Sequence, residues 1–282
     1  MQNSITLAED LTLGRIGYGA MQLAGPNAFG PPQDRAAAIQ VLRTAIDLGV
    51  THLDTSDYYG PHITNELIRE ALHPYPSDLR IVTKVGFRRG PTGSWDPSPH
   101  DLRTQVEANL QRLNLEVLDA VNLRVAGPGS LAKPFTELAA LRKEGLIRHL
   151  GVSNVTAAQV TEARTIAPIV FVQNMYNLAL RTDDDLIDAL ATDGIGYVPF
   201  FPLGGWTPLQ STTLNEVAAS IHATPQQTAL AWLLQRSPNL LPIPGTSSQS
   251  HLRENLAATS LTLPPEAKSR LDNATAPATK AE

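Results

Sequence analysis

Residues 119–127, Asp-Ala-Val-Asn-Leu-Arg-Val-Ala-Gly, lie between a helical pattern and a Gly-Pro-Gly turn. Short runs of β-branched and aliphatic residues such as this one are typical of strands that are buried on both faces. Arg124 departs from the pattern, because a guanidinium cannot be neutralised and is seldom buried without partners. The stretch therefore predicts a buried strand whose end carries an arginine that needs a partner.

Apolar runs of this kind recur along the chain, and helical patterns separate them. The eight predicted strands are 15–18, 52–55, 81–85, 120–125, 149–152, 170–173, 196–201 and 241–244. Eight such strands alternating with helices in 282 residues fit a (β/α)8 TIM barrel better than a doubly wound open sheet. We therefore expect a single α/β domain, a (β/α)8 barrel over residues 1–272, followed by a flexible tail at 273–282.

Capping residues predict where several of the helices begin. Asp34, Ser98, Thr156, Thr224 and Ser250 each stand directly before a helical pattern, where a side-chain oxygen can accept from the first backbone N–H groups. A proline follows two of them, at the first helical position that proline favours. The acidic run at 182–185 is interpreted as another helix start with acids in its first turn, and not as a metal site.

Composition excludes several classes of function. Lys and Arg total 22 against 27 Asp and Glu, and this mild acidity argues against nucleic-acid and anionic-membrane partners. The absence of cysteine excludes disulfides, thiol catalysis and Cys-ligated metals, and the seven histidines show no zinc-site spacing. No signal-peptide pattern or membrane-length apolar run is present, so we expect a soluble cytoplasmic protein. The sequence does not distinguish a monomer from a homo-oligomer.

Polar residues stand at the ends of the predicted strands, where a barrel of this kind carries its active site. Asp54 ends the second strand and is followed by Tyr59, Lys84 ends the third strand, and Arg124 ends the fourth. A tyrosine has a pKa near 10 and is a weak acid at neutral pH. A nearby ammonium that a carboxylate holds in place would lower this pKa. An Asp–Lys–Tyr group is therefore suited to donate a proton during carbonyl reduction.

The chain resembles the aldo-keto reductases over nearly its whole length. The resemblance rests on LGRIGYGAMQL, HLDTSDYYG, IVTKVG, LDAVNLR, GVSN, VFVQNMYNL, VPFFPLGG and IPGTSSQSHLREN, which occur in the order and spacing of that family. It implies a (β/α)8 barrel that uses NADPH (NADP+ when oxidised) without a Rossmann domain. It also implies that Tyr59 is the general acid and that Asp54 and Lys84 tune it. A small-molecule carbonyl compound, an aldehyde or a ketone, is the expected substrate.

The same resemblance implies a set of cofactor-binding residues. Ser153, Asn154 and Gln173 match the residues that hold the nicotinamide carboxamide, and Phe200 takes the place of the stacking aromatic. The other expected cofactor contacts are Gly19, Met21, Pro202, Leu203, Gly245, Thr246, Ser247, His251, Glu254 and Asn255. In the family a basic residue often binds the 2′-phosphate at this place. This chain has hydroxyl groups near residue 247 and His251 there, and NADPH remains the expected cofactor.

Arg124 departs from the family pattern, because most members carry a histidine five residues after the Asp of the LD motif. An arginine is always cationic and only donates hydrogen bonds. We expect Arg124 to point into the barrel mouth, to lower the pKa of Tyr59 and to bind the carbonyl oxygen or an acidic substrate group. The alternative is that it forms a structural ion pair with Asp54 or another carboxylate.

The arginine also indicates one subgroup of the family, because the VNLR segment resembles that of the bacterial pyridoxal reductases and their relatives. Pyridoxal is an aromatic aldehyde with an ionisable phenol beside the carbonyl group, which an arginine can pair with. Arg88, Trp95 and Trp206 are candidate residues for binding such a substrate, although surface packing is an equally good reading of them. Two other functions stay open. Lys84 suits the Schiff base of a class I aldolase, and a non-catalytic NADPH-binding sensor barrel has the same cofactor residues.

Overall fold

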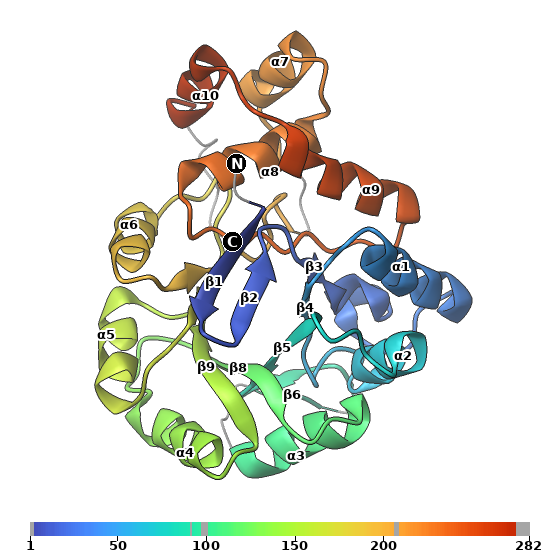
Figure 1. The fold of residues 1–282 in the computed structure, drawn as a ribbon, viewed down its shortest axis with the longest axis vertical. Helices are drawn as coiled ribbons and strands as arrows, with labels where there is room; N and C mark the ends of the chain where they lie inside the picture. The colour runs from blue at the N-terminus through green and yellow to red at the C-terminus, as the bar shows by residue number, and fades with distance from the viewer. Residues whose placement is uncertain (1–2, 91, 97–100, 206–208, 275–282) are drawn as a thin grey trace.

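The computed structural model describes residues 3–90, 92–96, 101–205 and 209–274. A curled parallel sheet forms the centre of the molecule and the helices surround it (Figure 1). Within the described residues the sheet has seven strands in the order β11-β10-β9-β8-β5-β4-β3. These strands are β3 (Tyr18–Gly19), β4 (His52–Asp54), β5 (Arg80–Val85), β8 (Leu118–Arg124), β9 (Ile147–Ser153), β10 (Phe171–Gln173) and β11 (Gly196–Tyr197). The predicted barrel is thus confirmed.

The eighth predicted strand, 241–244, is not a strand, although it lies where the barrel closes. Residues 239–245, called the closing segment below, bond to β11 through Tyr197 N to Asn239 O and Leu241 N to Tyr197 O, both 2.9 Å. On the other side Gly17 N donates to Pro242 O at 3.0 Å. Pro242 and Pro244 have no N–H to donate, so a regular ladder cannot form there. The prediction of an eighth strand was wrong for this reason.

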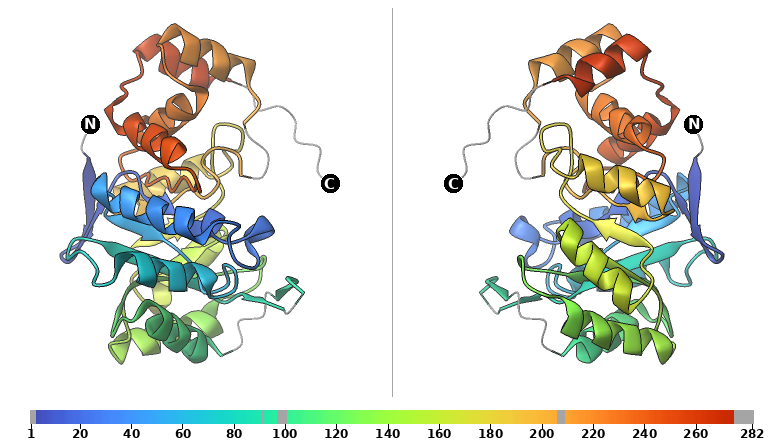
Figure 2. Two further views of the ribbon diagram at one scale, coloured as in Figure 1. Left: turned by 90° about the vertical axis from the view of Figure 1, so that its right-hand side faces the viewer. Right: turned by 90° about the vertical axis from the view of Figure 1, so that its left-hand side faces the viewer.

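The first barrel strand also differs from its predicted bounds of 15–18. β3 begins at Tyr18, and the residues before it form an antiparallel hairpin of β1 (Ser4–Ala8) and β2 (Leu11–Gly14). Leu11 and Leu13 are fully buried against the inward-facing side chains of the barrel. The hairpin covers one end of the barrel, and a second small hairpin, β6 (Arg88–Arg89) with β7 (Trp95–Asp96), lies at the opposite end (Figure 2).

Amphipathic helices form the outer layer, and their apolar faces pack against the outward-facing side chains of the sheet. They are α1 (Arg35–Asp47), α2 (Ile63–Leu72), α3 (Leu102–Leu113), α4 (Ala132–Lys143), α5 (Ala157–Ile166), α6 (Asp184–Thr192), α7 (Thr212–Ser220), α8 (Pro225–Arg236), α9 (Gln249–Ala257) and α10 (Pro265–Asp272). Short 3₁₀ turns occur at η1 (Ala20–Leu23), η2 (Pro26–Ala28) and η3 (Ala258–Ser260). No helix in the described part of the chain is long and apolar enough to cross a membrane.

The predicted helix starts are confirmed at Asp34, Thr156 and Thr224, whose side chains accept from backbone N–H groups. Two predictions need correction. Ser98 lies outside the described residues, and the N-cap of α3 is Asp101, whose side chain accepts from Thr104 N. In α9 the cap is Ser248, because Ser250 already lies within the first helical turn.

The acidic run at 182–185 does begin a helix, because α6 starts at Asp184 with two aspartates in its first turn. Asp183 stands at the N-cap position, but its side chain accepts no hydrogen bond from the first turn of the helix. It accepts instead from Tyr197 Oη at 2.8 Å. Within the described residues no group of His, Asp and Glu could hold a metal ion.

Candidate active site

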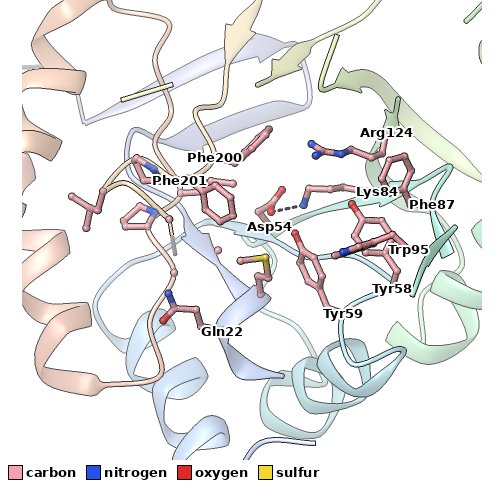
Figure 3. A pocket seen from close by; sticks show the side chains of 18 residues that line it. Gln22, Asp54, Tyr58, Tyr59, Lys84, Phe87, Trp95, Arg124, Phe200 and Phe201 are labelled. Carbon is pink, nitrogen blue, oxygen red and sulfur yellow. Dashed lines mark hydrogen bonds and ion pairs between the residues drawn. The ribbon is translucent and has the colours of Figure 1, made fainter. Parts of the chain in front are cut away.

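A cavity of about 500 Å³ opens at the carboxyl ends of the barrel strands (Figure 3). Parallel strands that curl into a barrel bring their last residues to one rim, which is why distant parts of the sequence meet there. The cavity contains the four predicted catalytic residues. Its lining residues are Gly19, Met21, Gln22, Asp54, Tyr58, Tyr59, Lys84, Phe87, Trp95, Arg124, Phe200, Phe201, Pro202, Leu203, Gly205, Ile243, Pro244 and Gly245.

Asp54 and Lys84 form a buried ion pair on the cavity floor. Lys84 Nζ lies 2.5 Å from Asp54 Oδ1 and donates to Thr55 O at 2.9 Å. The second carboxylate oxygen accepts from Gln173 Nε2 at 2.7 Å. Both side chains are at most 4% exposed, so the pair needs these bonds to offset the cost of desolvation. The carboxylate thus holds the ammonium beside Tyr59, as predicted.

Tyr59 lies next to this pair, with Lys84 Nζ 5.1 Å from the centre of its ring. Burial raises the pKa of Tyr59 well above its ordinary value, and the charge of Asp54 raises it further. Arg124 lowers this pKa, but the effect is smaller. The expected net lowering was therefore wrong for this structure, although Arg124 acts in the expected direction. The phenol keeps its proton at neutral pH and is available as an acid.

Tyr58 also lines the cavity, and sequence reasoning missed it. Its ring meets that of Tyr59 edge to face at 5.2 Å between centroids, and it contacts Phe87 and Trp95. Burial raises the pKa of Tyr58 to about 12. The doubled tyrosine in HLDTSDYYG was the available signal. Sequence reasoning also missed Phe87, Phe201 and the closing-segment residues Ile243 and Pro244. Their side chains have no polar group that would mark them as site residues.

Arg124 points into the cavity, and Figure 3 shows its guanidinium directed toward Phe200, above the Asp54–Lys84 pair in that view. Its Nη1 donates to Ser153 Oγ at 3.1 Å, and the guanidinium carbon lies 4.9 Å from the Phe200 ring and 5.6 Å from the Phe87 ring. Among the described residues no carboxylate lies within ion-pair distance of it. The alternative of a structural ion pair is therefore wrong, and the partners of this strand-end arginine are a hydroxyl and two aromatic faces.

The predicted nicotinamide residues divide into three groups. Phe200 lines the cavity, and Ser153 and Gln173 lie fully buried beneath it, where Ser153 Oγ donates to Gln173 Oε1 at 3.5 Å. Asn154 is exposed, does not line the cavity and donates to Val125 O at 2.8 Å. The structure thus brings three of the four predicted residues to one end of the cavity.

Two glycines bring the first barrel strand and the closing segment into contact beside the cavity. A Cβ on Gly19 would lie 2.6 Å from Ile243 O, and one on Gly245 would lie 2.7 Å from Gly19 O. This close approach is possible only because neither residue has a side chain, and both glycines line the cavity beside the contact. The residues present therefore fit a cofactor that extends from the floor of the cavity along this wall.

The predicted adenosine-binding residues continue from the same wall. Thr246 is buried and accepts from Tyr18 Oη and from Ser248 N. Ser247 and His251 are exposed at the start of α9, and Asn255 is buried one turn further on. Glu254 accepts from Thr224 Oγ1 at 2.5 Å, so it also fixes α9 to α8. Backbone N–H groups at this helix start can bind a phosphate.

Of the two predicted substrate residues that the structure describes, one lines the cavity and the other does not. Trp95 is half exposed and lines the cavity from β7. Arg88 does not line it and instead lines a neighbouring groove between the loop 57–62 and α3. Trp206 lies outside the described residues.

The chain is similar to several known proteins. The model of the Aldo/keto reductase family matches residues 15–276. The chain is 62% identical to the pyridoxine 4-dehydrogenase of Escherichia coli (strain K12), over 96% of this chain and 97% of that protein. It is 30% identical to a probable aldo-keto reductase 1 of Glycine max, over 88% and 82% of the two chains.

Solved structures share the fold. A thermostable aldo-keto reductase in complex with the inhibitor epalrestat superposes with a TM-score of 0.83 at 31% identity, covering 96% of this chain and 99% of that one. An aldo/keto reductase from Klebsiella pneumoniae, in complex with NADP and acetate, has a TM-score of 0.82 at 24% identity, covering 100% and 98%.

The family match and the 62% identical relative define an oxidoreductase of carbonyl compounds. The chain belongs to the aldo/keto reductase family. This membership confirms the predicted class of enzyme, an aldo-keto reductase.

Proposed function

We propose that this enzyme reduces pyridoxal, or a closely similar aromatic aldehyde, to the alcohol. The observation that carries the proposal is the position of Arg124, a cation that no carboxylate of the described residues neutralises, between two aromatic rings of the cavity wall. Pyridoxal has a flat aromatic ring and an acidic phenol beside its aldehyde. The relative in Escherichia coli, named pyridoxine 4-dehydrogenase, supports the same choice.

The cavity suits such a substrate in shape as well as in charge. Tyr58, Phe87, Trp95 and Phe200 form apolar walls on which an aromatic ring can pack. A phenolate held by the guanidinium of Arg124 would orient the neighbouring carbonyl group toward the floor. A purely aliphatic aldehyde would gain neither contact. We therefore expect selectivity for aromatic aldehydes with an acidic group next to the carbonyl.

When bound, NADPH supplies the hydride that adds to the carbonyl carbon. We assign its nicotinamide end to Ser153, Gln173 and Phe200 and its adenosine end to the start of α9. As negative charge develops on the carbonyl oxygen, Tyr59 gives it the phenolic proton, which yields the alcohol. Arg124 and the ammonium of Lys84 stabilise the resulting tyrosinate electrostatically, and Asp54 keeps that ammonium in place.

The test is NADPH oxidation with pyridoxal, measured beside NADH and beside a panel of aromatic and aliphatic aldehydes. We expect kcat/KM for pyridoxal to exceed the others and to fall by about 10²–10⁴ in Tyr59→Phe. Tyr75→Phe is the matched control, since Tyr75 bonds to Leu113 O outside the cavity and its variant keeps activity. Turnover of other aldehydes without pyridoxal would refute the substrate and keep the mechanism.

The two alternative functions have distinct outcomes. Lys84 forms an ion pair with Asp54 at 2.5 Å, whereas a Schiff base requires a free amine as the nucleophile. Trapping of Lys84 by borohydride with a carbonyl substrate would nevertheless revive the aldolase. Tight NADPH binding without turnover of any aldehyde would instead support the sensor barrel.

A further inference from the structure

The charges of the active-site cavity do not cancel. Among the described residues that line it, the ionisable groups are Asp54, Lys84, Arg124 and the two tyrosines. Asp54 and Lys84 neutralise each other at 2.5 Å, and burial raises the pKa of both tyrosines, so these keep their protons. The cavity is left with one positive charge, which belongs to Arg124.

This charge lies at the end of the cavity that we assign to the nicotinamide. The guanidinium bonds to Ser153 and lies over the ring of Phe200, and Ser153 in turn bonds to Gln173. These three residues are the ones proposed to hold the nicotinamide ring. Arg124 therefore shares its neighbours with the reacting part of the cofactor, while the adenosine end lies along the closing segment.

The two redox forms of the cofactor differ in charge at this ring. The nicotinamide ring is cationic in NADP+ and neutral in NADPH, and the rest of the molecule is the same in both. A fixed guanidinium between aromatic walls repels the cationic ring and leaves the neutral one unaffected, because the surrounding apolar groups screen the charge poorly. A neutral histidine, the usual residue here according to the family resemblance, would not discriminate in this way.

We propose that Arg124 makes the site bind NADPH more tightly than NADP+, and that it is the residue that sets this preference. The inference rests on the proposed function, since it needs the nicotinamide at this end of the cavity. Its consequence for catalysis is that the oxidised cofactor leaves readily after reduction of the carbonyl. Product inhibition by NADP+ is weak as a result.

Calorimetric titration of the cofactor-free enzyme with NADPH and with NADP+ tests the proposal without turnover. We expect the ratio of the two dissociation constants, NADP+ over NADPH, to be about ten in the wild type. Arg124→Met should lower this ratio about tenfold, mainly through tighter NADP+ binding, whereas Arg124→Lys should keep most of it. Arg112→Met is the control, because Arg112 lies outside the cavity in the neighbouring groove, and its ratio stays unchanged.

A histidine variant separates the effect of charge from that of shape. In Arg124→His the ratio should be near one at pH 8 and should rise toward the wild-type value at pH 5.5, as the imidazole gains its proton. The wild-type ratio should stay constant between these pH values, because arginine remains charged. The titratable groups that face this position, Asp54, Lys84, Tyr58 and Tyr59, are common to both proteins, so their response cancels in the comparison.

The outcomes are distinct. A ratio in Arg124→Met that equals that of the wild type, or a wild-type ratio near one, would overturn the proposal. Absence of binding by either form to the folded wild-type protein would instead overturn the proposed function. Thermal unfolding of each variant shows that the comparison concerns folded proteins.

Discussion

Replacement of His52 should make the protein less sensitive to acid. His52 lies on β4, two residues before Asp54 and on the same inward face. It is fully buried, its ring stacks on that of Phe171 at 6.3 Å, and neither ring nitrogen has a hydrogen-bond partner among the described residues. Burial lowers the pKa of His52 from 6.5 to about 4. The native state thus holds a neutral imidazole that the unfolded chain would protonate.

The sign and size of the effect follow from this shift. Because the folded-state pKa of His52 is lowered, its contribution to stability is fully present above pH 6.5 and is lost as the pH falls toward 4. The full shift corresponds to about 3 kcal/mol at 1.36 kcal/mol for each pKa unit. Between pH 7 and pH 5 the expected loss in the free energy of unfolding is about 2 kcal/mol.

The assay is urea unfolding of the cofactor-free protein at pH 7 and pH 5, for the wild type and for His52→Leu. Leucine fills a similar volume and does not titrate. The wild type should lose about 2 kcal/mol more than the variant between the two pH values. His251→Gln serves as the control, because this exposed histidine should leave the acid sensitivity of the wild type unchanged. Equal losses in the wild type and in His52→Leu would refute the reasoning.

Three further predictions concern groups that the fold buries. Burial raises the pKa of all six tyrosines, that of Tyr58 to about 12. Absorbance at 295 nm should therefore show no tyrosine ionisation in the native protein between pH 9 and 11. The urea-unfolded chain should titrate near pH 10. The resulting stability is present below the unfolded pKa and is lost at higher pH, so a native-state transition near pH 10 would contradict this. Arg15 donates to Leu234 O, Ser237 O and Leu240 O at 2.9–3.0 Å, and Arg15→Ala should cost at least about 3 kcal/mol in urea unfolding. The control Arg142→Ala removes one solvent-exposed bond to Arg148 O and should cost less than about 1 kcal/mol. Gly19→Ala should cost about 1–3 kcal/mol and weaken NADPH binding, because its Cβ would strike the closing segment, while Gly127→Ala meets open space and should change neither quantity. If Gly19→Ala unfolds and binds NADPH like the wild type, the contact between β3 and the closing segment is not tightly packed.

Local patterns were sufficient to place most strands and the polar residues at their ends. A continuous apolar run followed by one polar residue marks a strand that ends at the rim, and this correctly located Asp54, Lys84, Arg124, Ser153 and Gln173. The prolines in the closing segment argue against an eighth strand, because proline has no N–H to donate to a strand ladder. The N-terminal hairpin was not predicted, although apolar residues alternate on both sides of a Glu-Asp turn.

The sign of the Tyr59 pKa shift could not be taken from the sequence. A lysine and an aspartate nearby suggest a lowered pKa, but the structure buries the phenol and sets the carboxylate against it. Burial depends on how loops from separate strands pack over the cavity, and no spacing along the chain reports it. The same holds for the walls, because Phe87 and Phe201 come from loops with no pattern that directs them inward.

By itself, the sequence determined the barrel, the order of its strands and which side chains stand at their ends, because these depend on local periodicity and on the geometry of parallel sheets. Only the tertiary structure decided what surrounds Arg124. Its neighbours, Ser153, Phe87 and Phe200, come from three separate parts of the chain, and the carboxylate of Asp54 is already paired with Lys84. The net charge of the cavity depends on these long-range contacts, since an ion pair cancels a charge only where two distant residues actually meet.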